Sequence, residues 1–260
     1  RRHLIQAGSA GIAAAAQHST SAQESTSASI PTSVITAHDK GVDDLLARQV
    51  TDPASKYMGG FPDATGLYFP GSTAGIADHL TAAFVTKGSK HHQSGLLLDR
   101  IGKALDFATR GLSPDGNIYL PITNFNSPPD TAFFVLSLAA AAFYARKFQA
   151  VEITKRIEPL LKRNAEALIK GGVHTPNHRW VACSAMAQIH HLYPDPRLLR
   201  RIDQWLAEGI DINDDGQYSE QSVGGYSQIC DRAFVVMAEK LKRPELLEPV
   251  RRNLNSLLHL

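Results

Sequence analysis

The sequence predicts an all-α protein, an α/α toroid built as an incomplete ring of helical hairpins. Three observations lead to this prediction. From about residue 42 onward, helical segments alternate with glycine-centred loops. This pattern recurs with a period of about 50 residues, which is typical of repeat arrays and closed rings. No part of the repeats alternates apolar and polar residues over the length of a strand, so a β-sheet architecture is not expected.

Each repeat unit consists of a helix, a turn that contains glycine, a polar loop with aromatic residues, and a more apolar helix. In the first and third units an Asp-Gly turn precedes a tyrosine, and the second helix opens with Asp-x-Ala-Phe at Asp130 and Asp231. The helices are predicted at residues 96–109 and 130–146, then 157–169 and 181–192, then 198–208 and 231–241.

The number of units is smaller than a closed ring needs, even with one more hairpin before Leu96. The chain also ends at Leu260, within or just after a helix. We therefore expect an incomplete toroid, or a portion of a larger protein, over residues 36–260.

Composition favours a folded chain of nearly balanced charge. Hydrophobic residues make up 43% of the sequence and the formal net charge is +2. No basic stripe with interleaved aromatic residues is present, so nucleic-acid binding has little support. Cys183 and Cys230 lie in apolar helical patterns without a CxxC motif, which favours two buried thiols over a zinc site. A single bridge between these two cysteines is the alternative.

The N-terminal 35 residues have the composition of an export segment and a linker. Arg1 and Arg2 precede a short Ala/Gly-rich run at residues 8–16, and a Ser/Thr/Gln-rich stretch follows. This order is typical of a twin-arginine signal, so we expect export to the periplasm or beyond. A simple amphipathic N-terminus is the alternative. No other apolar run approaches the roughly 18 residues of a membrane span.

The strongest candidate site is the segment from Thr175 to Trp180, which opens a predicted helix. Proline at the first helical position places Asn177, His178 and Arg179 near a helix N-terminus, where amide groups favour an anion. His178 can exchange protons near neutral pH, Arg179 can bind a carboxylate, and Trp180 can stack on a sugar ring. A role limited to satisfying backbone groups at the helix start is equally compatible with these residue types.

A second candidate site is the glycine-rich loop at residues 214–227. Tyr218 and Tyr226 can act as proton-transfer groups there, and Glu220 can contact a ligand. Tyr119 and Asn124 occupy the corresponding loop of the first unit. For each of these residues, packing or loop hydrogen bonding is the more common role.

The sequence gives no sign of a metal or a cofactor. The paired histidines, His91–His92 and His190–His191, are adjacent and point in different directions on a helix. The acidic pair at residues 214–215 suits a turn rather than a calcium loop. Asp130 and Asp231 are expected to be helix caps.

The Asn-His pair at Asn177 and His178, with the later segment from Asp215 to Glu220, resembles the helical toroid lyases of the heparinase II/III and alginate lyase type. The resemblance covers about residues 96–254. It implies cleavage of uronic-acid-containing glycans by β-elimination, in enzymes that carry β-sheet domains after an incomplete toroid. This sequence ends before any such domain.

Carried over to this chain, the resemblance implies that Asn177 binds the uronate carboxylate and that His178 acts as the base or as a carboxylate partner. Tyr218 or Tyr226 would then protonate the leaving oxygen or share the role of base. Arg179 is our own addition, as a second group that holds the carboxylate.

Two other functions remain open. A glycoside hydrolase of the unsaturated glucuronyl type would need two acids flanking the bond, and the sequence offers Asp130, Asp215, Glu220 and Asp231. The recurrence of Asp130 and Asp231 at matched positions is more typical of structure than of catalysis. A glycan-binding helical module without catalysis is the other alternative.

Overall fold

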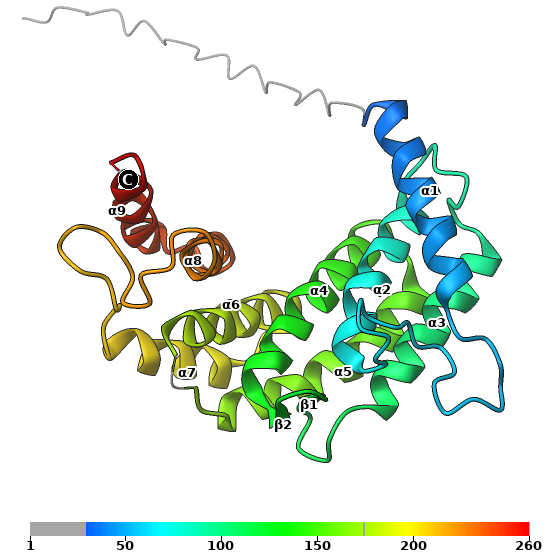
Figure 1. Cartoon of the computed structure of the whole chain (residues 1–260), viewed down its shortest axis with the longest axis horizontal. Helices are drawn as coiled ribbons and strands as arrows, with labels where there is room; N and C mark the ends of the chain where they lie inside the picture. Colours follow the sequence, from blue (N-terminus) through cyan, green and yellow to red (C-terminus); the bar gives the residue numbers. More distant parts are fainter. Residues whose placement is uncertain (1–29, 174, 260) are drawn as a thin grey trace, which may run out of the picture. The chain divides into compact units, whose positions relative to one another are not determined.

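The computed structural model describes residues 30–173 and 175–259 (Figure 1). The predicted twin-arginine signal lies outside these residues. Thr32–Leu260 form one compact unit. Helix α1 begins at Thr32, within the stretch expected to be a linker. The elements described are α1 (Thr32–Arg48), α2 (Pro70–Val85), α3 (Gly95–Arg110), β1 (Ile118–Leu120), β2 (Asn124–Ser127), α4 (Pro128–Lys147), α5 (Val151–Lys170), α6 (Pro176–Leu192), α7 (Pro196–Ala207), α8 (Tyr226–Leu241), η1 (Pro244–Leu247) and α9 (Glu248–Leu257).

The predicted helices are confirmed as α3 to α8, and the all-α prediction holds apart from one short hairpin. Strands β1 and β2 pair antiparallel through Ile118 and Ser127. Helices α4 and α7 begin two residues earlier than predicted, at Pro128 and Pro196, and α6 begins at Pro176, the proline already expected in its first turn. Proline is tolerated there since its missing N–H would be unpaired in any case.

The two aspartates expected to cap helices do not do so. Ser127 is the N-cap of α4, and its hydroxyl accepts a hydrogen bond from the Asp130 N–H at 3.3 Å. Asp130 therefore lies in the first turn, where its charge suits the positive end of the helix dipole. Asp231 lies inside α8, whose N-cap is Gly225.

The helices of Thr32–Leu260 form two layers. Helices α2, α4, α6 and α8 pack side by side as an inner row, and α3, α5, α7 and the η1–α9 segment pack behind them (Figure 1). This alternation is that of an α/α toroid. Because the partners in each hairpin run antiparallel, all inner helices begin at the same end of the row. The loops that precede the inner helices therefore also lie at that end.

Helix α6 lies at the centre of the inner row. Every residue from 180 to 187 is buried, as expected for a helix that is covered on all sides. Small residues dominate this stretch and the middle of α4, which allows neighbouring helix backbones to approach closely. Among the described helices, none is both long enough and apolar enough to cross a membrane.

Two glycine turns dock against the backbone of the next outer helix. Gly116 and Gly216 have φ angles of +86° and +88°. A Cβ atom would lie 2.3 Å from the Arg163 carbonyl oxygen at Gly116, and 2.4 Å from the Arg252 carbonyl oxygen at Gly216. Neither turn can accept a larger residue without moving the helix behind it.

A buried amide in the same outer helix holds each turn. The Asn164 Nδ2 donates to the Gly116 carbonyl oxygen at 2.7 Å, and the Asn253 Nδ2 donates to that of Gly216 at 3.0 Å. Both asparagines are almost fully buried. Each buried carbonyl group therefore has the partner that burial requires.

We predict that Gly116→Ala lowers the free energy of unfolding by about 3 kcal/mol, because the added methyl group displaces the α5 backbone. Gly66 is the matched control, since it has the same φ of +86° but no atom within 4 Å of the added Cβ. Gly66→Ala should cost only about 1 kcal/mol of backbone strain. Urea unfolding of both variants measures the difference. Equal losses of unfolding free energy in the two variants would show that the close approach of Gly116 to α5 does not contribute to stability.

Candidate functional site

The inner helices present one open face, which contains a cavity of about 140 Å³. On α6 the spacing of Val181, Ser184 and Gln188 places these residues along one stripe of the helix. Residues at similar spacing on α4 and α8 complete the lining. The remaining lining residues are Phe133, Leu136, Ala140, Ile229, Arg232, Ala233 and Val236.

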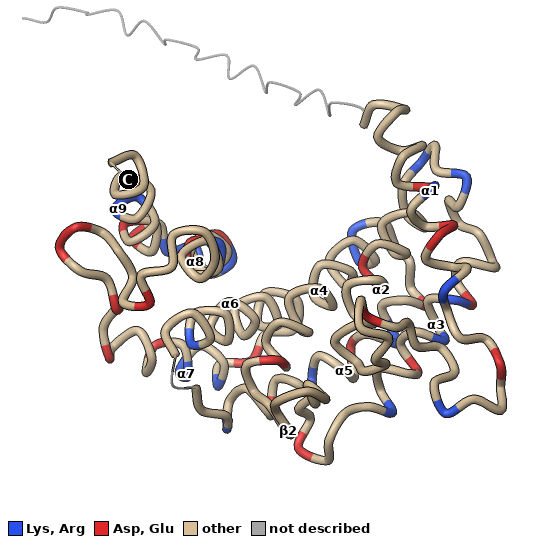
Figure 2. Tube along the Cα trace, in the orientation of Figure 1, with Lys and Arg blue, Asp and Glu red and all other residues tan. Residues whose placement is uncertain are grey.

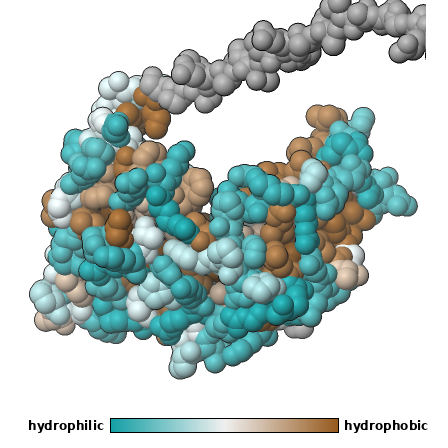
Figure 3. Space-filling model, turned by 180° about the vertical axis from the view of Figure 1, so that it is seen from behind, coloured by the Kyte–Doolittle hydropathy of each residue, from teal (hydrophilic) through white to brown (hydrophobic). Residues whose placement is uncertain are grey.

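A second cavity, of about 260 Å³, continues the first along the same helices. The two share Ala140, Gln188 and Val236, so they form one groove, called here the inner groove. Large apolar side chains of α4 and α8 remain exposed, and hydrophobic areas are visible on the surface in Figure 3. The other lining residues of the second cavity are Ala139, Phe143, Tyr144, His191, Leu192, Glu239 and Lys240.

The first cavity combines apolar walls with polar groups that have no protein partner. The Ser184 hydroxyl is buried, with 1% of the residue exposed, and forms no hydrogen bond in the described structure. Arg232 is exposed and forms no ion pair or hydrogen bond with the described residues. An apolar cavity with a few unpaired polar groups is the usual form of a ligand site.

Burial shifts the pKa of two further side chains, Asp78 on α2 and His191 at the second cavity. Burial raises the pKa of Asp78 on α2, while the positive charges of His79 and Arg232 oppose this rise. Burial lowers the pKa of His191, and Lys240 and Lys242 lower it further. Both effects favour the neutral form of His191 at the second cavity.

His178 does not itself line the inner groove, but it lies next to the Phe133 end of that groove. It is partly exposed, and its ring packs edge-on against Phe133, with centroids 6.0 Å apart. Phe133 itself lines the groove. Tyr226, the first residue of α8, is 50% exposed and precedes Ile229 and Ala233 at helical spacing. The structure therefore leaves both side chains accessible at this end.

The anion that the start of α6 was expected to bind is supplied by the protein. The Asn177 N–H donates to the Glu220 Oε2 at 3.1 Å, and the Thr175 side chain makes no capping bond. Asn177 is 2% exposed. Glu220 therefore occupies the positive end of α6 and connects it to the loop before α8.

Arg179 and Trp180 are engaged in packing. Arg179 pairs with Glu208 at 2.9 Å and with Asp211, and its guanidinium lies over the Trp180 ring. Trp180 is fully buried against Phe234. Neither side chain has a free face for a ligand in this structure. Figure 2 shows acidic residues gathered on the loop between α7 and α8, which carries Asp211, Asp214, Asp215 and Glu220.

Tyr218 belongs to the same loop, and its side chain is buried. Its hydroxyl donates to the Asp231 Oδ1 at 2.9 Å. Burial and the negative charge of Asp231 raise the pKa of Tyr218. Burial also raises the pKa of Asp231, and the hydrogen bond from Tyr218 partly opposes this shift. Tyr218 thus keeps its proton and attaches the loop to α8.

Tyr119 and Asn124 lie on the β1–β2 hairpin. Tyr119 packs edge-on against Phe125, and the Asn124 Nδ2 donates to the Asp130 Oδ2 at 3.2 Å. The hairpin precedes α4, so it lies at the same end of the inner row as His178. Neither residue lines the inner groove.

Sequence reasoning missed Arg232, Ser184 and Gln188. The i, i+4 spacing of Ser184 and Gln188 was a usable signal, since two polar residues share one stripe of an apolar helix. The spacing alone does not tell which neighbour covers that stripe.

The two cysteines are buried free thiols, as predicted. Burial raises the pKa of Cys230 to about 12 and also raises that of Cys183, which makes both thiols unreactive. Within the described part of the chain, no group of three or more His, Cys, Asp or Glu side chains is arranged to hold a metal ion.

The fold is similar to that of known carbohydrate enzymes. A sugar epimerase from a ruminal bacterium matches with a TM-score of 0.52 and 13% identity, over 86% of this chain and 71% of the epimerase. A polysaccharide lyase matches at a TM-score of 0.38 and 10% identity, over 88% of this chain and 47% of the lyase, too weakly to support an argument. No protein-family model and no curated protein matches the chain. The similarity to the epimerase establishes the fold.

We predict that Asp231→Asn becomes more stable relative to the unaltered protein as the pH rises from 4 to 7. The raised pKa means that folding favours the protonated carboxyl group, so stability is lost as Asp231 ionises above its ordinary pKa of 3.8. Asparagine does not ionise and can still accept the Tyr218 hydrogen bond. Urea unfolding at several pH values gives the comparison. A difference that stays constant with pH would contradict the proposed burial of this carboxylate.

Proposed function

We propose that the protein is a carbohydrate-active enzyme that binds a uronic-acid-containing glycan in the inner groove and cleaves it by β-elimination. The observation that carries this proposal is that Arg232, which forms no ion pair with the described residues, and the unpartnered Ser184 hydroxyl line the same cavity among mostly apolar side chains. Arginine binds a carboxylate through two parallel hydrogen bonds. The chemistry of the groove therefore suits an acidic sugar.

Arg232 takes the role that sequence reasoning gave to Arg179. The guanidinium of Arg232 neutralises the uronate carboxylate, which makes the neighbouring C5 proton more acidic. Asn177 is buried at the start of α6, where its N–H donates to Glu220, and His178 follows it in the first turn of that helix. Ser184 and Gln188 bind sugar hydroxyl groups along the groove.

His178 and Tyr226 carry the proton transfers in this proposal. His178 removes the C5 proton, the C4–O bond breaks, and a C4=C5 double bond forms. Tyr226 donates its proton to the leaving oxygen. Positioned acids and bases of this kind typically contribute a factor of about 10² to 10⁴ each.

Hydrolysis has less support from the geometry. Asp130, Asp231 and Glu220 are engaged with Ser127, Tyr218 and the start of α6, and Asp215 lies exposed in a turn. None of these acids lines the inner groove. A hydrolase needs two carboxyl groups flanking one bond, and these residues do not provide such a pair.

We predict that incubation with alginate, heparan, chondroitin or glucuronate-capped glycans produces ultraviolet absorbance from a conjugated double bond. His178→Ala and Arg232→Met should each lower the rate by about 100-fold or more, because one removes the base and the other the carboxylate partner. Arg251→Met is the matched control, because Arg251 is exposed on α9 and pairs only with Glu248. This variant should keep the full rate.

Other outcomes of the same assay would replace elimination by another function. New reducing ends without absorbance would indicate hydrolysis. Solvent deuterium at a sugar carbon of an uncleaved product would indicate epimerisation, the activity of the structurally similar epimerase. Saturable glycan binding without any product would indicate a binding module. Neither binding nor product across the panel would reject a role on acidic glycans.

A further inference from the structure

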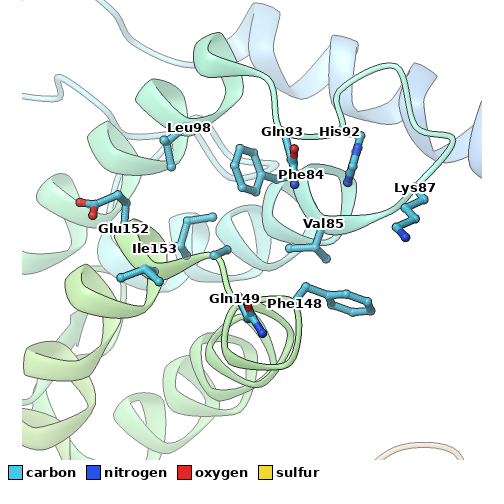
Figure 4. Close-up of a pocket in the computed structure, with 12 residues that line it drawn as sticks. Phe84, Val85, Lys87, His92, Gln93, Leu98, Phe148, Gln149, Glu152 and Ile153 are labelled. Atoms are coloured by element: carbon cyan, nitrogen blue, oxygen red, sulfur yellow. The ribbon is translucent and has the colours of Figure 1, made fainter.

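A separate cavity of about 330 Å³ lies at the opposite end of the inner helices (Figure 4). It is enclosed by the C-terminal end of α2, the loop that follows it, α3, and the connection from α4 to α5. The Phe133 end of the inner groove, next to His178, lies where the inner helices begin, and this cavity shares no lining residue with either part of the groove. Apolar walls dominate the lining, through Phe84, Val85, Leu98, Phe148, Ala150, Val151 and Ile153.

Two glutamines with left-handed backbone conformations open onto this cavity. Gln93 has a φ of +54° and Gln149 a φ of +59°. Gln149 follows the end of α4, where the Ala150 N–H donates to the Ala145 carbonyl oxygen at 2.7 Å. Glycine is the favoured residue at such a helix end, because a Cβ atom is strained there. Strain of this kind is concentrated at ligand sites.

The glutamine side chains have polar groups to offer a ligand. Both side chains are exposed at the rim of the cavity, and neither carboxamide forms a hydrogen bond to the described residues. Figure 4 shows Gln93 beside His92 on one side of the cavity and Gln149 beside Phe148 on another. A carboxamide both donates and accepts, so it matches an amide or hydroxyl group of a bound molecule.

The unbalanced charge at the cavity is positive. In the loop after α2, Lys90 and His91 bind Asp43 of α1, whereas Lys87 forms no ion pair with the described residues. The one acidic lining residue, Glu152, pairs with Lys155 at 3.1 Å. Lys87 is therefore available to bind an anionic group.

We propose that this cavity binds a small amphipathic carboxylate, with its apolar body against the phenylalanines and its carboxylate at Lys87. Gln93 and Gln149 bind a polar group between these two parts. The volume lies at the lower end of the range for small-molecule sites, which suits a ligand of this size. The proposal is independent of the activity proposed for the inner groove.

Calorimetric titration of the full chain with N-acetyl-phenylalanine and with its neutral amide tests the proposal. The carboxylate should bind saturably and about tenfold more tightly than the amide. Lys87→Met should remove this preference. Gln149→Gly should weaken binding about fivefold while raising the melting temperature by about 2 °C, since it relieves backbone strain.

Gln221→Gly is the matched control. Gln221 has a φ of +48° and lies outside the cavity, so this variant should be stabilised without loss of binding. A purely structural role for Gln149 predicts unchanged affinity in Gln149→Gly, and that result would overturn the proposal. Equal binding of the carboxylate and the amide, or no saturable binding of either, would overturn it as well.

Discussion

The docking of a glycine turn against the backbone of an outer helix is the constraint on which the architecture depends. At Gly116 and Gly216 the turn touches the carbonyl group of an arginine, and a buried asparagine from the same helix holds the turn in place. A related contact occurs at Gly59, which approaches Lys103 of α3, but the Gln49 side chain that donates to its carbonyl oxygen at 3.0 Å follows α1 and does not belong to α3. A side chain would prevent the approach, and an unpaired buried carbonyl would cost free energy. These contacts hold the loops before α2, α4 and α8 against the outer helices.

That constraint brings the loops to one end of the inner row, and charge pairing then decides which groups remain available there. Glu220 occupies the start of α6, and Arg179 is held by Glu208 and Asp211. An arginine surrounded by its own acidic partners contributes to stability rather than to recognition. Arg232 forms no such pair with the described residues, and it lines the inner groove.

Glycine and glutamine both occupy left-handed backbone positions in this protein. At the docked turns glycine relieves the strain, since the space for a side chain is absent. At the cavity between α2 and α5, glutamine occupies left-handed positions where glycine would be easier. The strain at Gln93 and Gln149 favours a role for their side chains, in a cavity that shares no lining residue with the inner groove.

The sequence by itself determined the all-α class, the repeat of about 50 residues, the positions of α3 to α8, and the Asp-Gly turns. These features depend on local propensity and periodicity, which a single chain segment contains. Only the tertiary structure decided that Trp180 and Tyr218 are buried, that Glu220 caps α6, and that Ser184 and Arg232 face the groove. Helical spacing shows which residues share a face, but the neighbours that cover that face come from distant parts of the chain. Because the middle of α6 is apolar on all sides, its sequence does not show which face lines a groove, and only the packing of the neighbouring helices decides this.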